Sequence, residues 1–231
     1  MLFLIQSLEG YSTIEILAVC LGYFLAVCIA LTFHEWAQAF TAYKCGDDTA
    51  KLAGRLTLNP LAHMSGWGLL CFAFIGFGWG KPVPLNPAKF RSYRKHSVLV
   101  ILSGVLANFL LAFVFAGLCL FVGGLCIVEW LSSGNILCLF VENFLYFTLE
   151  LNIILMLFNL LPIPPLAGFN LISLLTKYGN KFVEFMLKYG FIVLLVLILP
   201  LFNGYSALSL FYNYALPLFE SYFLFFWGLF I

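Results

Sequence analysis

Charged residues are scarce in this chain of 231 amino acids. Only 9% of its residues are Asp, Glu, Lys or Arg, whereas 64% are hydrophobic, and the mean hydropathy is +1.06. Eleven basic and ten acidic residues leave a net charge of +1, without a dense stripe of lysine and arginine. We therefore expect no nucleic-acid partner. The composition is typical of a polytopic helical membrane protein.

Metal-binding and targeting signals are also sparse. The chain has three histidines, and its seven cysteines lack the spacing of a zinc knuckle or a redox pair. We interpret the cysteines as small buried thiols. The first fifteen residues have neither a basic segment nor a small-residue cleavage signature, so they are expected to be mature sequence rather than a signal peptide.

Long uncharged runs dominate the chain instead. They predict an all-α polytopic membrane protein, a single integral-membrane domain over residues 1–231 with about four to six transmembrane helices. We expect spans at about residues 14–42, 97–128 and 143–161, with a break at the glycine pair 123–124, and a further crossing from about residue 189. Residues 204–231 either return through the membrane or lie in its interface.

Two unusual stretches follow the first span. Residues 44–60 are polar and rich in turn residues, which suits a small surface hairpin. Residues 66–80 are uncharged but number only fifteen, five of them glycine, which suits a re-entrant or hairpin segment better than a full crossing. Basic residues flank this segment on both sides. By the positive-inside rule both flanks should be cytoplasmic, which requires the segment to enter the membrane and return.

Three groups of polar residues interrupt the apolar runs. The first is His34, Glu35 and Gln38, at the end of an uncharged run over residues 16–33. Ionisable residues at membrane depth usually mark function. The nearest template is His-Glu-x-x-His on a helix, in which two histidines one turn apart hold zinc and the glutamate activates water, but here Gln38 stands at the second histidine position. A helix end that simply meets lipid headgroups is the alternative.

The other two groups lie further along the chain. Asn108 lies in the middle of an apolar run, in the sequence Gly-Val-Leu-Ala-Asn at residues 104–108, and an interhelical hydrogen bond is the simplest explanation for it. Residues 158–168 read Phe-Asn-Leu-Leu-Pro-Ile-Pro-Pro-Leu-Ala-Gly. Their prolines cannot continue a helix, so backbone groups are freed near membrane depth, where they must line a wet cavity or be buried in protein. A proline-rich helix end at the cytoplasmic surface remains the alternative.

Taken together, these motifs resemble the site-2 protease family of intramembrane zinc metalloproteases in its compact bacterial and archaeal form. The resemblance is carried by residues 34–40, 59–63, 80–87, 104–108 and 158–168, and it fades in the first dozen residues and in the variable C-terminal helices at 189–231. It implies an integral protein of a prokaryotic cell membrane, with the active-site motifs nearer the cytoplasmic face.

The resemblance also implies roles for individual residues. His34 would be a zinc ligand, Glu35 the catalytic acid and base, and Asn108 and Asn159 the amides that steady the substrate. Two further ligand positions of the family carry Gln38 and Ala167, which replace a histidine and an aspartate. Because a catalytic zinc normally has three protein ligands, we expect zinc binding to be weak or absent here.

The leading hypothesis is therefore a protease scaffold that lies in the lipid bilayer, admits a transmembrane segment of another membrane protein, and is proteolytically impaired or inactive. One alternative is an active zinc-dependent endopeptidase of membrane-anchored regulators whose metal site is rescued, with His63 as the candidate ligand. Another is a module that binds membrane segments without chemistry. A small transporter is a fourth hypothesis, suggested only by broken helices with polar residues at depth.

Overall fold

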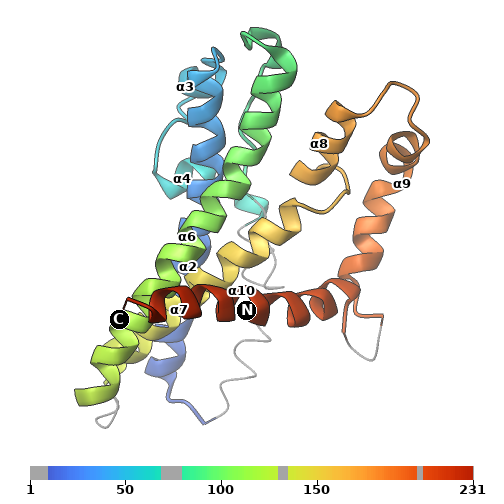
Figure 1. Cartoon of the computed structure of the whole chain (residues 1–231). Coiled ribbons are helices and arrows are strands. Elements are labelled where there is room, and N and C mark those ends of the chain that lie inside the picture. The colour runs from blue at the N-terminus through green and yellow to red at the C-terminus, as the bar shows by residue number, and fades with distance from the viewer. Residues whose placement is uncertain (1–9, 69–79, 130–134, 202–204, 231) are drawn as a thin grey trace.

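The computed structural model describes residues 10–68, 80–129, 135–201 and 205–230, with the backbone alone for residues 123–129. The described residues form helices and no strand (Figure 1). The helices are α2 (Thr13–Lys44), α3 (Thr49–Leu52), α4 (Pro60–His63), the short 3-10 helix η1 (Pro87–Lys89), α6 (Tyr93–Glu129), α7 (Ile136–Asn159), α8 (Ala167–Leu175), α9 (Lys181–Ile198) and α10 (Ala207–Gly228). The predicted all-α class is confirmed.

Helices α2, α6 and α7 form the centre of the protein. Among the described residues they are the three helices that are long and apolar enough to cross a membrane. Figure 1 shows them running beside one another, and all three pairs are in contact. Gly22 allows α2 to approach α7 closely, because a Cβ atom there would lie 3.2 Å from the backbone nitrogen of Phe144. The predicted total of four to six spans requires at least one crossing beyond these three, and crossings by α9 and α10 remain predictions.

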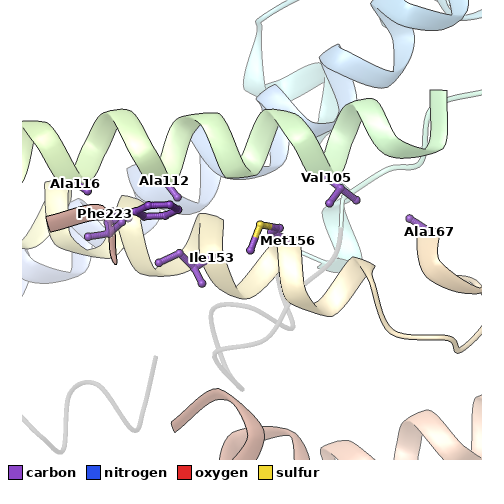
Figure 2. Packing of buried hydrophobic residues seen from close by; sticks show 8 residues of the cluster. Val105, Ala112, Ala116, Ile153, Met156, Ala167 and Phe223 are labelled. Carbon is purple, nitrogen blue, oxygen red and sulfur yellow. The ribbon is translucent and has the colours of Figure 1, made fainter. Parts of the chain in front are cut away.

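The main apolar core lies where α6, α7, α8 and α10 meet. Its buried members are Val105, Ala112, Ala116, Leu149, Ile153, Met156, Ala167 and Phe223 (Figure 2). Phe223 of α10 is fully buried and its ring packs edge to face on Phe109 and Phe113 of α6. The indole nitrogen of Trp227 donates a hydrogen bond to the Phe113 carbonyl at 2.8 Å. Helix α10 therefore packs against the helices and crosses them in Figure 1 instead of running alongside.

Three expectations about element boundaries are wrong in detail. Helix α6 continues through the glycine pair 123–124 without the expected break, since a glycine lowers helix stability by only about 1 kcal/mol and apolar surroundings demand that each backbone group stay hydrogen-bonded. Helix α7 begins at Ile136, where Asn135 caps it, and α9 begins at Lys181, where Asn180 caps it. Both helices therefore begin several residues before the expected starts at about residues 143 and 189.

The stretch 44–60 holds the helix α3 in place of the expected hairpin. Asp47 is fully buried and accepts hydrogen bonds from the Thr49 backbone nitrogen at 3.0 Å and from the Asn86 backbone nitrogen at 2.6 Å. The side chain thus satisfies backbone groups that a strand ladder would otherwise pair. It also ties the α2–α3 turn to the segment that precedes η1.

The two ends of the predicted re-entrant segment lie side by side. Met64 and Gly80 form an isolated antiparallel bridge, and the Lys81 backbone nitrogen donates to the His63 carbonyl at 2.7 Å. The chain therefore leaves and returns at one place, as a re-entrant or hairpin segment requires. Residues 69–79, which would show its path between these ends, lie outside the described residues.

Candidate functional site

The site is built around His34, whose side chain is 7% exposed in the last third of α2. Its ring packs against α6 at Gly104, where an added Cβ atom would come within 2.7 Å of the imidazole Nε2 and Cε1 atoms. Only a glycine leaves room for the ring at this distance. The Gly-x-x-x-Asn motif of α6 therefore serves two purposes, since Gly104 admits the ring and Asn108 lies one turn further along the same face.

A buried hydrogen-bond network holds the ring. His34 Nδ1 lies 2.6 Å from Asn108 Oδ1, and the amide nitrogen of Asn108 donates to the Ala30 carbonyl at 3.2 Å and to Asn152 Oδ1 at 2.7 Å. Because the amide oxygen of Asn108 can only accept, Nδ1 of the imidazole must carry the proton. The neutral ring therefore keeps its lone pair on Nε2.

Gln38 makes a hydrogen bond to that lone pair. It lies one turn after His34 on the same face of α2, and its amide nitrogen donates to His34 Nε2 at 3.2 Å. Both nitrogens of the imidazole are thus satisfied by protein side chains. The buried imidazole therefore has a complete set of hydrogen bonds and no nitrogen free for a further partner.

Ala167 is the first residue of α8, which packs against α6. It is 7% exposed and shares the apolar core with Val105, the neighbour of Gly104 in the chain (Figure 2). Gly168, next in the chain, is required for the start of α8 to pack against the end of α7, because a Cβ atom there would lie 2.2 Å from the Leu160 carbonyl oxygen. The turn that contains the prolines at 162, 164 and 165 therefore brings position 167 to α6, but it presents a methyl group.

Glu35 points away from this network toward the loop that follows residue 79. Its Oε2 atom accepts a hydrogen bond from the Val83 backbone nitrogen at 3.0 Å, and its Oε1 atom lies close to Gly80. Arg55 is near enough to interact electrostatically with this carboxylate. The guanidinium is 4% exposed and donates through Nη2 to the Lys81 carbonyl. Glu35 is thus anchored to the loop that begins at Gly80 and leads into the basic residues between 81 and 95.

Asn159 and His63 are not in the network. Asn159 donates its amide to the Leu155 carbonyl of its own helix at 2.9 Å, and His63 donates from Nε2 to the Thr57 carbonyl at 2.7 Å. The His63 ring is fully buried, and its Nδ1 atom has no hydrogen-bond partner among the described residues. Its imidazole is therefore committed to the loop, although its backbone lies beside Gly80.

Asn152 is the member of the network that the sequence motifs missed. It is fully buried on α7. Its amide oxygen accepts a hydrogen bond from the Asn108 amide nitrogen, and its own amide nitrogen donates to the Thr148 carbonyl at 2.7 Å. One signal could have found it: Asn152 lies seven residues before Asn159, so both amides lie on the same face of one helix.

Two curated bacterial proteins are similar to this chain over most of its length. The Bacillus subtilis (strain 168) protein named "Putative zinc metalloprotease YwhC" is 38% identical over 184 residues, which cover 78% of this chain and 81% of that relative. The chain belongs to the site-2 protease family. The Mycolicibacterium smegmatis protein named "Putative zinc metalloprotease Rip2" is 29% identical over 185 residues, 77% of this chain and 65% of that relative. No family model matches the chain, and no solved structure matches it.

The names of these two relatives imply zinc in the family. Zinc in a catalytic site takes three protein ligands, drawn from imidazole, thiolate and carboxylate groups. The positions that the resemblance predicts as ligands, 34, 38 and 167, hold one imidazole with both nitrogens hydrogen-bonded, a neutral amide and a methyl group. Among the described residues no three His, Cys, Asp or Glu side chains converge on another such site. The residues present do not fit the metal.

Proposed function

We propose that this chain is a site-2 protease scaffold that accommodates a transmembrane segment of another membrane protein and is impaired in cleaving it. The hydrogen bond from Gln38 to Nε2 of His34 supports this best, because it uses the lone pair through which the imidazole would bind a metal. A neutral amide and a methyl group stand at the other two ligand positions. Loss of a single outer partner of a metal ligand already costs about 10- to 100-fold in affinity or activity, so loss of two direct ligands should cost more.

The residues at these positions also lower the free-energy cost of burying the site without a metal. A free cluster of two histidines and an aspartate would leave polar and charged groups in a low-dielectric cavity. In this chain Asn108, Asn152 and Gln38 satisfy His34, and Ala167 adds no polar group. The scaffold is thereby stable without zinc.

Zinc content tests the proposal directly. We would purify the full chain in detergent, load it with zinc, remove unbound metal and measure zinc per chain by mass spectrometry. The same measurement is made on the double variant Gln38→His, Ala167→Asp and on a triple variant that adds His34→Ala. The original chain should hold little zinc, the double variant about one per chain, and the triple variant little again. Stoichiometric zinc in the original chain, lost on His34→Ala, would contradict the proposal and restore proteolysis as the leading function.

Capture of a membrane segment is tested separately. The double variant should cleave a single-span test substrate, whereas the original chain should bind the same substrate without releasing fragments. Glu35→Gln should then leave capture by the original chain unchanged, because binding without chemistry needs no acid or base. If neither the original chain nor Glu35→Gln binds segments that the double variant cleaves, the role in accommodation is wrong.

We also propose that the site faces the cytoplasm. All eleven Lys and Arg residues lie between residues 44 and 95 or between residues 177 and 188. Such an excess of basic residues marks cytoplasmic loops. Cysteine substitutions at Lys51, Lys89 and Lys177 should react with an impermeant thiol reagent from the same side of the membrane; reaction of Lys51→Cys and Lys89→Cys from opposite sides would overturn this topology.

A further inference from the structure

A cavity of about 730 Å³ lies apart from the His34 network, between the start of α6 and the connection from α8 to α9. Neither His34 nor Glu35 lines it. Its walls come from two segments that are far apart in the sequence: residues 85–101, and residues 170–187, which end in the first two turns of α9. It therefore joins the two basic regions of the chain.

The polar part of the cavity is positively charged. Arg94 and Lys177 line it from opposite segments, both with exposed side chains, and Glu184 is the one acidic residue in its wall. The first turn of α6, which contains Arg94, holds no acidic residue, so the positive end of the helix dipole is not neutralised there. The local charge suits an anion.

The remaining wall is apolar and continues along the helices. It is formed mainly by Phe90, Val100, Ile101, Leu174, Val183 and Leu187. Leu187 is exposed on α9, and Val100 and Ile101 lie on a helix that is long and apolar enough to span a membrane. A small hydrophilic anion would have no use for this apolar wall. A ligand with an anionic head and an apolar tail would match both parts.

Ser97 adds a polar group to the wall between these two parts. It is 8% exposed, and its hydroxyl has no hydrogen-bond partner among the described residues. It lies one turn after Arg94 in the same helix, so the two side chains lie on the same face. A buried hydroxyl without a partner costs stability, and a phosphate oxygen that reached it would remove that cost.

We propose that this cavity binds the phosphate headgroup of an anionic phospholipid, with Arg94 and Lys177 as its cationic contacts and the apolar wall against an acyl chain. Basic pockets between membrane helices near the cytoplasmic side are suited to such headgroups. The lipid would link the start of α6 to the α8–α9 connection. The proposal needs neither zinc nor proteolysis, so it stands or fails independently of the function proposed above.

The test measures phospholipid binding to the full chain by native mass spectrometry in detergent. Phosphatidylglycerol is titrated against phosphatidylcholine, which has a zwitterionic headgroup. The double variant Arg94→Ala, Lys177→Ala should bind phosphatidylglycerol roughly 30-fold more weakly than the original chain. The matched control is Lys95→Ala, Lys181→Ala, which removes the same charge from neighbouring positions that do not line the cavity and should leave the affinity unchanged.

Each other outcome overturns the proposal. Equal loss in both double variants would mean that the lipid responds only to the net charge of the surface. Equal affinity for the two phospholipids would remove the requirement for an anionic headgroup. Displacement of phosphatidylglycerol by inorganic phosphate in modest excess would show a site for a soluble anion instead. Arg94→Lys with Lys177→Arg preserves the charge, and its failure to bind together with an unchanged melting temperature would also contradict the assignment.

Discussion

The amide nitrogen of Gln38 lies 3.2 Å from Nε2 of His34, while Nδ1 of the same ring lies 2.6 Å from Asn108. An imidazole in this setting has a defined tautomer and no free lone pair. The Gln38 amide therefore uses the one imidazole nitrogen through which His34 could otherwise bind a metal.

Removal of the Gln38 amide should lower the stability of the protein, because His34 then loses one of its two hydrogen bonds. Gln38→Ala leaves Nε2 of His34 without a donor in a half-buried position, and we expect a loss of about 1 kcal/mol in the free energy of unfolding. Thermal unfolding in detergent gives the stability, and ¹⁵N NMR of labelled histidine gives the tautomer, which should be the Nδ1–H form in the original chain. Asn213→Ala, which removes an exposed amide from α10, is the control. Equal melting temperatures for all three proteins would show that water replaces the amide without cost.

Two asparagines on the same face of α7 should respond differently to substitution. Asn152 pairs with Asn108 of a neighbouring helix at 2.7 Å, whereas among the described residues Asn159 bonds its own helix, at the Leu155 carbonyl. Asn152→Ala should lower the free energy of unfolding by about 0.6–2 kcal/mol, the range for hydrogen bonds between membrane helices. Asn159→Ala should have a smaller effect on stability. A larger effect at Asn159 would contradict the network described here.

The spans were largely predictable because length and hydropathy decide them. Helices α2, α6 and α7 follow from apolar stretches that are long enough to cross a bilayer. Their exact starts were not predictable from hydropathy, since capping by Asn135 and Asn180 extends α7 and α9 beyond the uncharged runs. A cap depends on one side chain and one backbone geometry, whereas a hydropathy pattern averages over many residues.

The candidate site was predictable in its parts but not in its pairing. The motifs identified His34, Gln38 and Asn108, and the structure brings these three together. Which amide of α7 meets Asn108 depends on how far α7 is shifted along α6, and two residues seven positions apart share a face equally well. The shift depends on packing between α6 and α7 and not on any local motif.

Gly104 should be intolerant of even one added methyl group. In Gly104→Ala the new Cβ would lie 2.7 Å from the His34 ring, and the ring is held on both nitrogens. We expect a loss of about 1–3 kcal/mol in the free energy of unfolding from this overpacking. Gly228→Ala is the matched control, because a Cβ atom there meets nothing within 4 Å. The contrast is lost if both variants unfold at the same temperature.

The loop histidine His63 should make stability depend on pH. Burial lowers the pKa of His63, the hydrogen bond to the Thr57 carbonyl opposes that shift, and the positive charge of Arg55 adds to it. The folded state therefore binds a proton less readily than the unfolded state, in which histidine titrates near about 6.5. Stability from this group is fully present above about pH 6.5 and is lost as the pH falls through the lower, folded-state pKa.

The substitution His63→Gln separates this group from every other titrating residue. Glutamine can still donate to the Thr57 carbonyl, which His63 Nε2 contacts at 2.7 Å, but it cannot accept a proton from solution in this range. Melting temperatures of the original chain and of His63→Gln, measured from pH 7.5 to 5.0, should run parallel above about pH 6.5 and diverge below it, with the original chain losing more stability. Parallel curves over the whole range would mean that protonation of the buried His63 ring does not lower the stability of the protein at acidic pH.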